Sequence, residues 1–220
     1  MEKAEARTKL IFVRHGQSEA NLKAIFGGRE CDFPLTELGH KQAKIMAEYI
    51  LKKYKIDAIY SSDLSRAADT AREVARPLGM EINYDKRLRE IDGGLWNGMA
   101  FADISKEYEQ EVELWRSDLS KVQPPGGENV FDLQKRAMSA ITDIAEKENG
   151  KTVFVATHRV LLRTVQCVWE NRSLYDINKC EWLSNCSVNE VLFSQGKLIP
   201  VNIGQDDFMG ELITKVSTSM

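Results

Sequence analysis

The sequence has no long apolar run, no CxxC pair and no excess of positive charge, and each absence excludes a class of protein. No apolar stretch approaches the roughly 18 residues of a membrane-spanning helix, so no membrane contact is expected. A formal net charge of −3 argues against nucleic acid binding, which usually requires a basic face. The four cysteines show no zinc-site spacing. The sequence therefore predicts a protein in a reducing compartment.

The N-terminal stretch MEKAEARTK is charged from its start and lacks the apolar segment of a signal peptide, so we expect a cytoplasmic protein. A length of 220 residues and a hydrophobic fraction of 43% fit one soluble domain with a sizeable core. We therefore expect a single domain over residues 1–220. It should include an excursion at about 90–127 and a loosely ordered tail at about 205–220.

Short apolar runs alternate with amphipathic stretches along the chain. The runs predict strands over 10–13, 57–60, 152–156 and 188–193, with a weaker one over 197–203. Helical periodicity predicts helices over about 38–50 after an N-cap at Thr36, over 67–78 before Gly79, and over 130–145. This alternation predicts an α/β fold of three layers, αβα, with helices on both faces of a mostly parallel central sheet.

The segment from about Glu90 to Gly127 differs from the rest, because it is rich in glycine, tryptophan and charge. We expect a mostly helical excursion that covers the ligand site, since insertions of this kind commonly wall off such sites. Within it, the stretch PPGGEN is interpreted as a lid or a turn.

Polar residues follow the predicted strands where those strands end, which is where sheets of this kind bind ligands. These residues are Arg14, His15 and Gly16 after the first strand, Ser61, Ser62 and Arg66 after the second, and Thr157 and His158 after the third. Glu90 opens the excursion. Two of the only three histidines thus lie at strand ends near arginine, while His40 is expected on the solvated side of a helix.

This combination of residue types indicates phosphate chemistry. Arginine presents a rigid fork of donors that matches phosphate oxygens, and helix N-termini add backbone N–H groups. A neutral imidazole held beside phosphate can attack phosphorus, and a nearby carboxylic acid can protonate the departing alkoxide. We therefore expect a pocket for a phosphate dianion.

Five segments, in this order, resemble the signature motifs of the histidine phosphatase superfamily, in its phosphoglycerate mutase-like group. They are RHGQSEAN, DFPLTELGHKQA, SSDLSRAADTA, LREIDGGLWNG and VFVATHRVLLR, within a match from about residue 8 to residue 193. The resemblance implies a metal-independent phosphatase without cofactor, which hydrolyses phosphomonoesters of small metabolites through phosphohistidine. A homodimer is compatible with the sequence.

The resemblance also implies roles for individual residues. His15 matches the nucleophile, Glu90 the proton donor, and His158 the histidine that stabilises the transferring phosphoryl group. The remaining matched residues bind phosphate or line the substrate turn: Arg14, Asn21, Gly27, Gly28 and Arg66. No metal site is implied, because arginines and histidines supply the positive charge.

The chain departs from the family pattern in two ways. Arg159 follows the second histidine, where mutase-type members usually have glycine, and it would add charge or narrow the pocket. The arginine-rich lid of the mutases is missing, so hydrolysis is favoured. Two alternatives remain: a cofactor-dependent phosphoglycerate mutase, and a phosphate-binding module without turnover.

Several other side chains allow two interpretations. Trp96 either belongs to the core or lines the pocket entrance. Arg29, Arg159 and Arg163 either bind a second anionic group of the substrate or form surface ion pairs.

Overall fold

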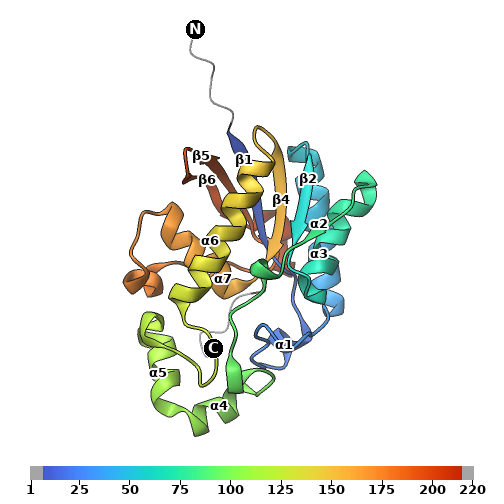
Figure 1. Ribbon diagram of the computed structural model, residues 1–220. Helices are drawn as coiled ribbons and strands as arrows, with labels where there is room; N and C mark the ends of the chain where they lie inside the picture. Colours follow the sequence, from blue (N-terminus) through green and yellow to red (C-terminus); the bar gives the residue numbers. More distant parts are fainter. Residues whose placement is uncertain (1–6, 215–220) are drawn as a thin grey trace.

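The computed structural model describes residues 7–214 and is built on a six-stranded sheet with the order β3-β2-β4-β1-β5-β6 (Figure 1). Its strands are β1 (Thr8–Arg14), β2 (Ala58–Ser61), β3 (Asn83–Tyr84), β4 (Thr152–Thr157), β5 (Val188–Ser194) and β6 (Lys197–Gln205). The five predicted strands are therefore all present, and β3 is an addition at the edge of the sheet.

The pairing of β1 and β4 sets the position of the site. These strands run parallel, and their register places Arg14 opposite Thr157 at their carboxyl ends. β2 pairs in parallel with β4 and with β3, whereas β5 pairs antiparallel with both β1 and β6. The predicted mostly parallel sheet is confirmed. The residues that follow β1, β2 and β4 consequently meet at one edge.

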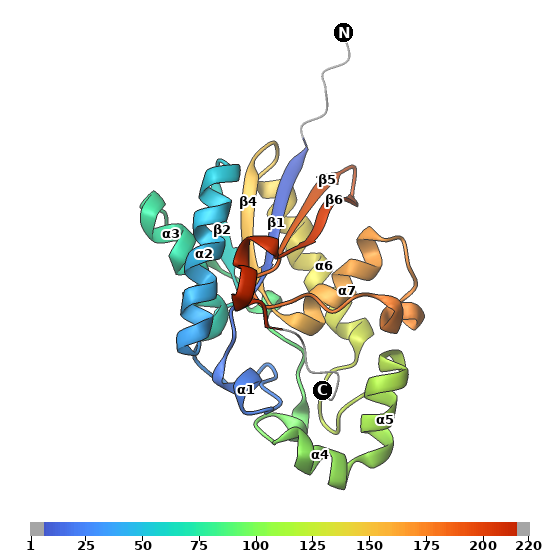
Figure 2. The ribbon, with the colours of Figure 1, turned by 180° about the vertical axis from the view of Figure 1, so that it is seen from behind.

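Helices cover both faces of the sheet, as predicted. On one face lie α2 (Glu37–Lys53) and α3 (Ser65–Leu78), and on the other α6 (Val130–Lys147) and α7 (Arg159–Trp169) (Figures 1 and 2). β1 alternates between them: Ile11 and Val13 pack in the core of α2 and α3, while Leu10 and Phe12 pack in that of α6 and α7. This alternation follows from the two-residue period of a strand.

Two helix boundaries predicted from capping chemistry are confirmed. The Thr36 side chain accepts a hydrogen bond from the backbone N–H of Gly39, at the start of α2. Gly79 ends α3 in the left-handed conformation, with a φ of 61°.

The excursion lies below the carboxyl ends of the strands, beside the short helix α1 (Glu19–Leu22) (Figure 1). It contains two α-helices, α4 (Phe101–Glu107) and α5 (Glu109–Ser117), and the short 3-10 helices η2 (Gly94–Trp96) and η3 (Leu119–Lys121). The 3-10 helix η1 (Lys86–Leu88) directly precedes the excursion.

The tail differs from its prediction over the residues that the structure describes. Asp207–Leu212 form a 3-10 helix, η5, which packs on α2 and buries Met209. The weak periodicity of so short a segment concealed this contact, and residues 215–220 lie outside the described part. A further 3-10 helix, η4 (Leu174–Lys179), follows α7. Between residues 7 and 214, the structure contains no helix of the length and apolarity that a membrane crossing requires.

Candidate active site

The turn after β1 delivers His15 to the edge of the sheet. The backbone N–H of His15 donates to the carbonyl of Thr157 at 3.0 Å, which ties the ends of β1 and β4 together. A Cβ on Gly16 would lie 2.5 Å from the carbonyl oxygen of Gly39, so only glycine lets this turn approach the start of α2.

The ring of His15 has a defined tautomer. Its Nδ1 lies 2.7 Å from the carbonyl oxygen of Gly16, and because a carbonyl only accepts, Nδ1 carries the proton. Nε2 therefore keeps a free lone pair. Burial, followed by the positive charges of Arg66 and Arg14, lowers the pKa of His15 well below its usual 6.5. The imidazole is neutral at physiological pH.

His158 lies beside His15, with 5.2 Å between the ring centroids. It occupies the N-cap position of α7, and its Nε2 shares a 2.8 Å hydrogen bond with the hydroxyl of Ser62, after β2. Burial, Arg66 and His15 together lower the pKa of His158 well below 6.5. Its Nδ1 is buried and meets no hydrogen-bond partner within residues 7–214.

Arg66 and Arg14 bring positive charge to the two histidines. Arg66, in the first turn of α3, donates through Nη2 to the Gly28 carbonyl at 2.9 Å, which fixes the Gly27–Gly28 turn against it. Arg14 donates to the carbonyl of Leu183 at 2.7 Å. Burial lowers the pKa of Arg14 to about 10, so it remains a cation at neutral pH.

The turn around Gly28 requires glycine. Its φ is 52°, and an added Cβ would lie 1.7 Å from the side-chain oxygen of Asn97. The glycine at position 28 thus has a packing reason in this chain, whereas a Cβ on Gly27 would make only ordinary contacts.

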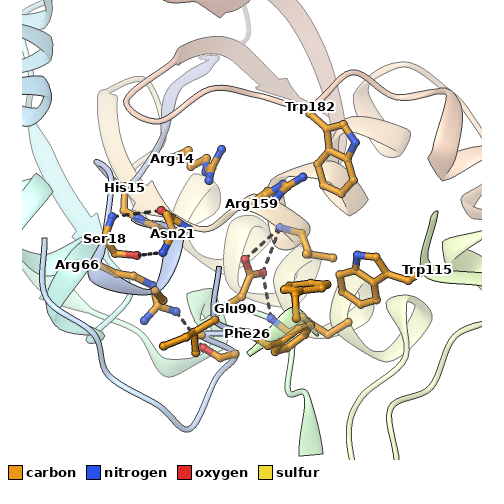
Figure 3. Close-up of a pocket in the computed structure, with 17 residues that line it drawn as sticks. Arg14, His15, Ser18, Asn21, Phe26, Arg66, Glu90, Trp115, Arg159 and Trp182 are labelled. Atoms are coloured by element: carbon orange, nitrogen blue, oxygen red, sulfur yellow. Dashed lines mark hydrogen bonds between the residues drawn. The ribbon is translucent and has the colours of Figure 1, made fainter. Parts of the chain in front are cut away.

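Asn21 lies beside Ser18 in the pocket wall, on the same side as His15 (Figure 3). It forms a capping box with Ser18, since its side-chain oxygen accepts from the Ser18 backbone N–H at 3.2 Å. The amide of Asn185 donates to the same oxygen at 3.3 Å and to the His15 carbonyl at 2.8 Å. Asn185 thereby links two predicted site residues, and no motif in the sequence marked it.

Glu90 faces the pocket from the start of the excursion (Figure 3). Its carboxylate accepts from the backbone N–H groups of Ile91, Val160 and Leu161 at 3.0 to 3.2 Å. The last two belong to the first turn of α7, whose positive end suits a carboxylate. The carboxylate is thus fixed by backbone groups.

Aromatic side chains form a further wall of the pocket, which encloses about 580 Å³ including the space open to solvent. Phe26, Phe101, Trp115 and Trp182 line it, together with Arg159. None of these four was predicted to line the site, since the tryptophans Trp115 and Trp182 were expected in the core. Of its two interpretations for Trp96, the structure supports the core: the side chain is fully buried behind Phe26 and Trp115.

Most of the predicted site residues share this one pocket. Its lining includes Arg14, His15, Asn21, Gly27, Gly28, Arg66 and Glu90. His158 is fully buried beside His15, while His40 is exposed on α2, as predicted. The stretch PPGGEN is a turn: the backbone N–H of Gly127 donates to the Pro124 carbonyl at 2.8 Å.

A family model described as "Histidine phosphatase superfamily (branch 1)" matches residues 10–205. The chain belongs to this family. The resemblance noted from the five motifs is confirmed, and relatives and solved neighbours that are named phosphatases indicate a phosphoric monoester hydrolase. The arrangement of His15, His158, Glu90 and the arginines is therefore the candidate active site of a phosphatase.

Relatives and solved structures agree with this membership. The chain is 34% identical over 159 residues, 72% of its length and 74% of the relative's, to "Phosphoserine phosphatase 1" of Hydrogenobacter thermophilus. It is 31% identical over 87% of its length and 79% of the relative's to "Metal-independent phosphoserine phosphatase" of Arabidopsis thaliana.

A mutase is also among the relatives. The chain is 35% identical, over 78% of its length and 86% of the relative's, to "2,3-bisphosphoglycerate-dependent phosphoglycerate mutase" of Mesorhizobium japonicum. Among solved structures, YhfR of Bacillus stearothermophilus superposes with a TM-score of 0.88 at 28% identity, covering 92% of this chain and 99% of that one.

Proposed function

We propose that this histidine phosphatase hydrolyses phosphomonoesters of small cytoplasmic metabolites, without a metal ion, through a phosphohistidine on His15. One observation carries the proposal: Nδ1 of His15 is bound to the Gly16 carbonyl, so the lone pair of Nε2 is free in a pocket lined by Arg14 and Arg66. The lowered pKa of the ring keeps that lone pair available.

The proposed reaction has two steps. Nε2 of His15 forms a bond to phosphorus while the bond from phosphorus to the leaving oxygen breaks, and Glu90 transfers its proton to that oxygen. Glu90, now a carboxylate, then takes a proton from water, whose oxygen attacks phosphorus. The N–P bond breaks, inorganic phosphate leaves, and both residues return to their starting states.

Fixed cations support this chemistry without Mg²⁺. Arg14 and Arg66 are both buried, so their charge acts on phosphoryl oxygens with little screening by water. If the Ser62 hydroxyl donates to Nε2 of His158, then Nδ1 of that ring carries a proton and can donate to a phosphoryl oxygen. The name of the Arabidopsis relative, a metal-independent phosphatase, supports the same interpretation.

A phosphatase assay tests the proposal. Purified protein with p-nitrophenyl phosphate and EDTA should release phosphate, and His15→Ala should abolish the release. O-phosphoserine is the first metabolite to test, because two relatives carry phosphoserine phosphatase in their names. Release that EDTA abolishes would overturn metal independence, and no release at all would favour a non-catalytic phosphate-binding module.

The same preparation separates hydrolase from mutase. With 3-phosphoglycerate and 2,3-bisphosphoglycerate, we expect slow interconversion to 2-phosphoglycerate compared with phosphate release. Interconversion faster than hydrolysis would contradict the proposal and would place the chain with the mutase relative.

A further inference from the structure

Three arginines near the pocket have different surroundings. Arg29 is compensated, because its Nε pairs with Glu30 at 2.8 Å and its Nη2 with Asp92 at 2.9 Å. Arg163 is buried and donates to the Cys180 carbonyl at 3.3 Å, but it does not line the pocket. Arg159 lines the pocket directly. The sequence left all three as candidates for a second anionic group, and only Arg159 retains that option in the structure.

The guanidinium of Arg159 forms no ion pair with residues 7–214, although the charge of Glu90 acts on it from nearby. Its Nε and Nη2 are buried, and neither has a hydrogen-bond partner among residues 7–214. Figure 3 shows the side chain between Arg14 and Trp182, close to Glu90, and its Cζ lies 3.8 Å from the centre of the Trp182 ring. Burial lowers its pKa to about 9, so it is still positively charged at neutral pH. Two guanidinium N–H groups that are shielded from water and make no hydrogen bond are costly, and an anionic ligand can supply the missing acceptors.

The unpaired edge of Arg159 has a counterpart elsewhere in this chain. Arg89 uses Nε and Nη2 to hold both carboxylate oxygens of Asp63, at 2.6 and 2.7 Å. Arg136 holds Glu128 through the same two nitrogens, at 2.7 and 2.8 Å. Two parallel N–H donors in one plane match a carboxylate. In this molecule, the Nε and Nη2 donors of two other arginines thus each bind a carboxylate.

We propose that Arg159 binds a carboxylate of the substrate, so that the preferred substrates are phosphomonoesters whose leaving group carries a carboxylate. This inference rests on the proposed phosphatase function. The phosphoryl group lies at His15, Arg14 and Arg66, and the carboxylate lies toward Trp182. The aromatic wall of Phe26 and Trp115 contacts the carbon chain between them. The Nε–Nη2 edge is closed to solvent, so a rotation of Arg159 or Trp182 accompanies binding.

Trp182 positions this arginine. Its indole lies against Arg159, and the Cζ of Arg163 is 3.5 Å from the centre of the same ring. Such cation–π contacts orient a guanidinium without using its N–H donors. The donors of Arg159 therefore remain available for a ligand.

Matched substrates test the proposal, since each pair differs chiefly at one carboxylate. O-phosphoserine is compared with O-phosphoethanolamine, and 3-phosphoglycerate with sn-glycerol 3-phosphate. In the wild type, kcat/KM should favour the carboxylated member by about 10- to 100-fold, the usual range for a hydrogen-bonded charged group. In Arg159→Gln the ratio should fall toward one. Arg159→Lys should give an intermediate ratio, because lysine keeps the charge but lacks the fork.

Arg29→Gln is the matched control. It also removes one positive charge near the pocket, but one already paired with Glu30 and Asp92, so the ratio should stay at the wild-type value. A ratio near one in the wild type, an unchanged ratio in Arg159→Gln, or an equal fall in Arg29→Gln would each overturn the inference.

Phosphate inhibition distinguishes a carboxylate site from a further phosphate clamp. In Arg159→Gln, the KM for O-phosphoserine should rise much more than the inhibition constant of inorganic phosphate. Equal increases in the two constants would place Arg159 on the phosphoryl group and would overturn the inference. The release of phosphate from p-nitrophenyl phosphate by the wild type separates this inference from the proposed phosphatase function. If the wild type hydrolyses p-nitrophenyl phosphate but shows no preference for carboxylated substrates, only this inference fails. If it hydrolyses no substrate, both fail.

Discussion

At the scale of single residues, the two site histidines are ionisable side chains that are buried next to positive charges. His15 and His158 lie next to one another and to Arg66, and burial and these positive charges make protonation unfavourable. A neutral imidazole is what a nucleophile at phosphorus requires. The local environment that prepares the site for chemistry therefore also makes it sensitive to acid.

This sensitivity predicts a pH dependence of stability. The folded-state pKa of both histidines lies below 6.5, so under pH 6.5 the unfolded chain binds more protons and the free energy of unfolding decreases as the pH falls. Each histidine contributes up to about 1.4 kcal/mol per pH unit until its folded-state pKa is reached. Above about pH 7 this contribution is constant. Urea unfolding at pH 5 to 8 measures it.

Variants identify the groups responsible. His158→Gln should reduce the slope between pH 5 and 6.5 to the part that His15 contributes, whereas His40→Gln, on the exposed face of α2, should leave it as in the wild type. Paired carboxylates such as Asp63 have lowered pKa values and affect stability at lower pH. An unchanged slope in His158→Gln would show that this ring is not buried in its neutral form.

At the scale of elements, α6 and the turn before it hold the segment that carries Glu90. Arg136 of α6 donates to the carbonyls of Arg87, Arg89 and Glu90 at 2.7 to 2.8 Å. Glu128 fixes the same guanidinium through two hydrogen bonds. The backbone before the proposed proton donor is therefore set by a side chain that does not line the pocket.

We expect Arg136→Gln to act as a positioning variant. It should lower kcat/KM for alkyl phosphates about 10- to 100-fold, because small displacements of a catalytic group are costly. The variant should lower kcat/KM less for p-nitrophenyl phosphate, because that leaving group hardly needs a proton from Glu90. Glu90→Gln should show the same dependence on the leaving group.

The matched control is Arg87→Gln, on the same segment. Arg87 pairs with Asp85 and Asp143 near the surface, away from the backbone of Glu90. Replacing Arg87 should change kcat/KM only slightly, and by the same factor for alkyl and aryl phosphates. Equal slowing of both substrate types in Arg136→Gln would indicate a structural role alone.

At the scale of the whole molecule, the segment 207–214 supports the other side of the site. Met209 is buried against α2, and Phe208 stacks on Tyr49 with 4.2 Å between ring centroids. Gln42 bridges the two parts, because it donates to the Leu212 carbonyl and accepts from the backbone N–H of Gln17, both at 2.8 Å. The tail is thus connected to the turn that carries His15.

Met209→Ala tests this connection. Removing a buried methionine side chain should lower the free energy of unfolding by about 2 kcal/mol or more. Glu211→Ala, in the same segment but exposed and beyond the kink at Gly210, should change it by less than about 0.5 kcal/mol. Denaturant unfolding of both variants provides the measurement, and equal effects would contradict the packing of η5 on α2.

The sequence predicted the parts of the molecule that depend on local pattern. Strand ends, the Thr36 and Gly79 caps and the motif residues follow from periodicity, capping and signature spacing. It could not predict which tryptophans reach the pocket, because an indole has the same apolar signature in a core and in a wall. Asn185 and Met209 act through contacts distant in sequence, which only the tertiary structure reveals.

The most direct test of the account is to trap the enzyme during turnover. Rapid mixing with ³²P-labelled substrate, followed by an alkaline quench and peptide mapping, should show an acid-labile phosphoryl group on the His15 ring. The same experiment with His15→Ala should show no label and no turnover. Label on another residue of the wild type, or undiminished turnover by His15→Ala, would contradict nucleophilic catalysis by His15.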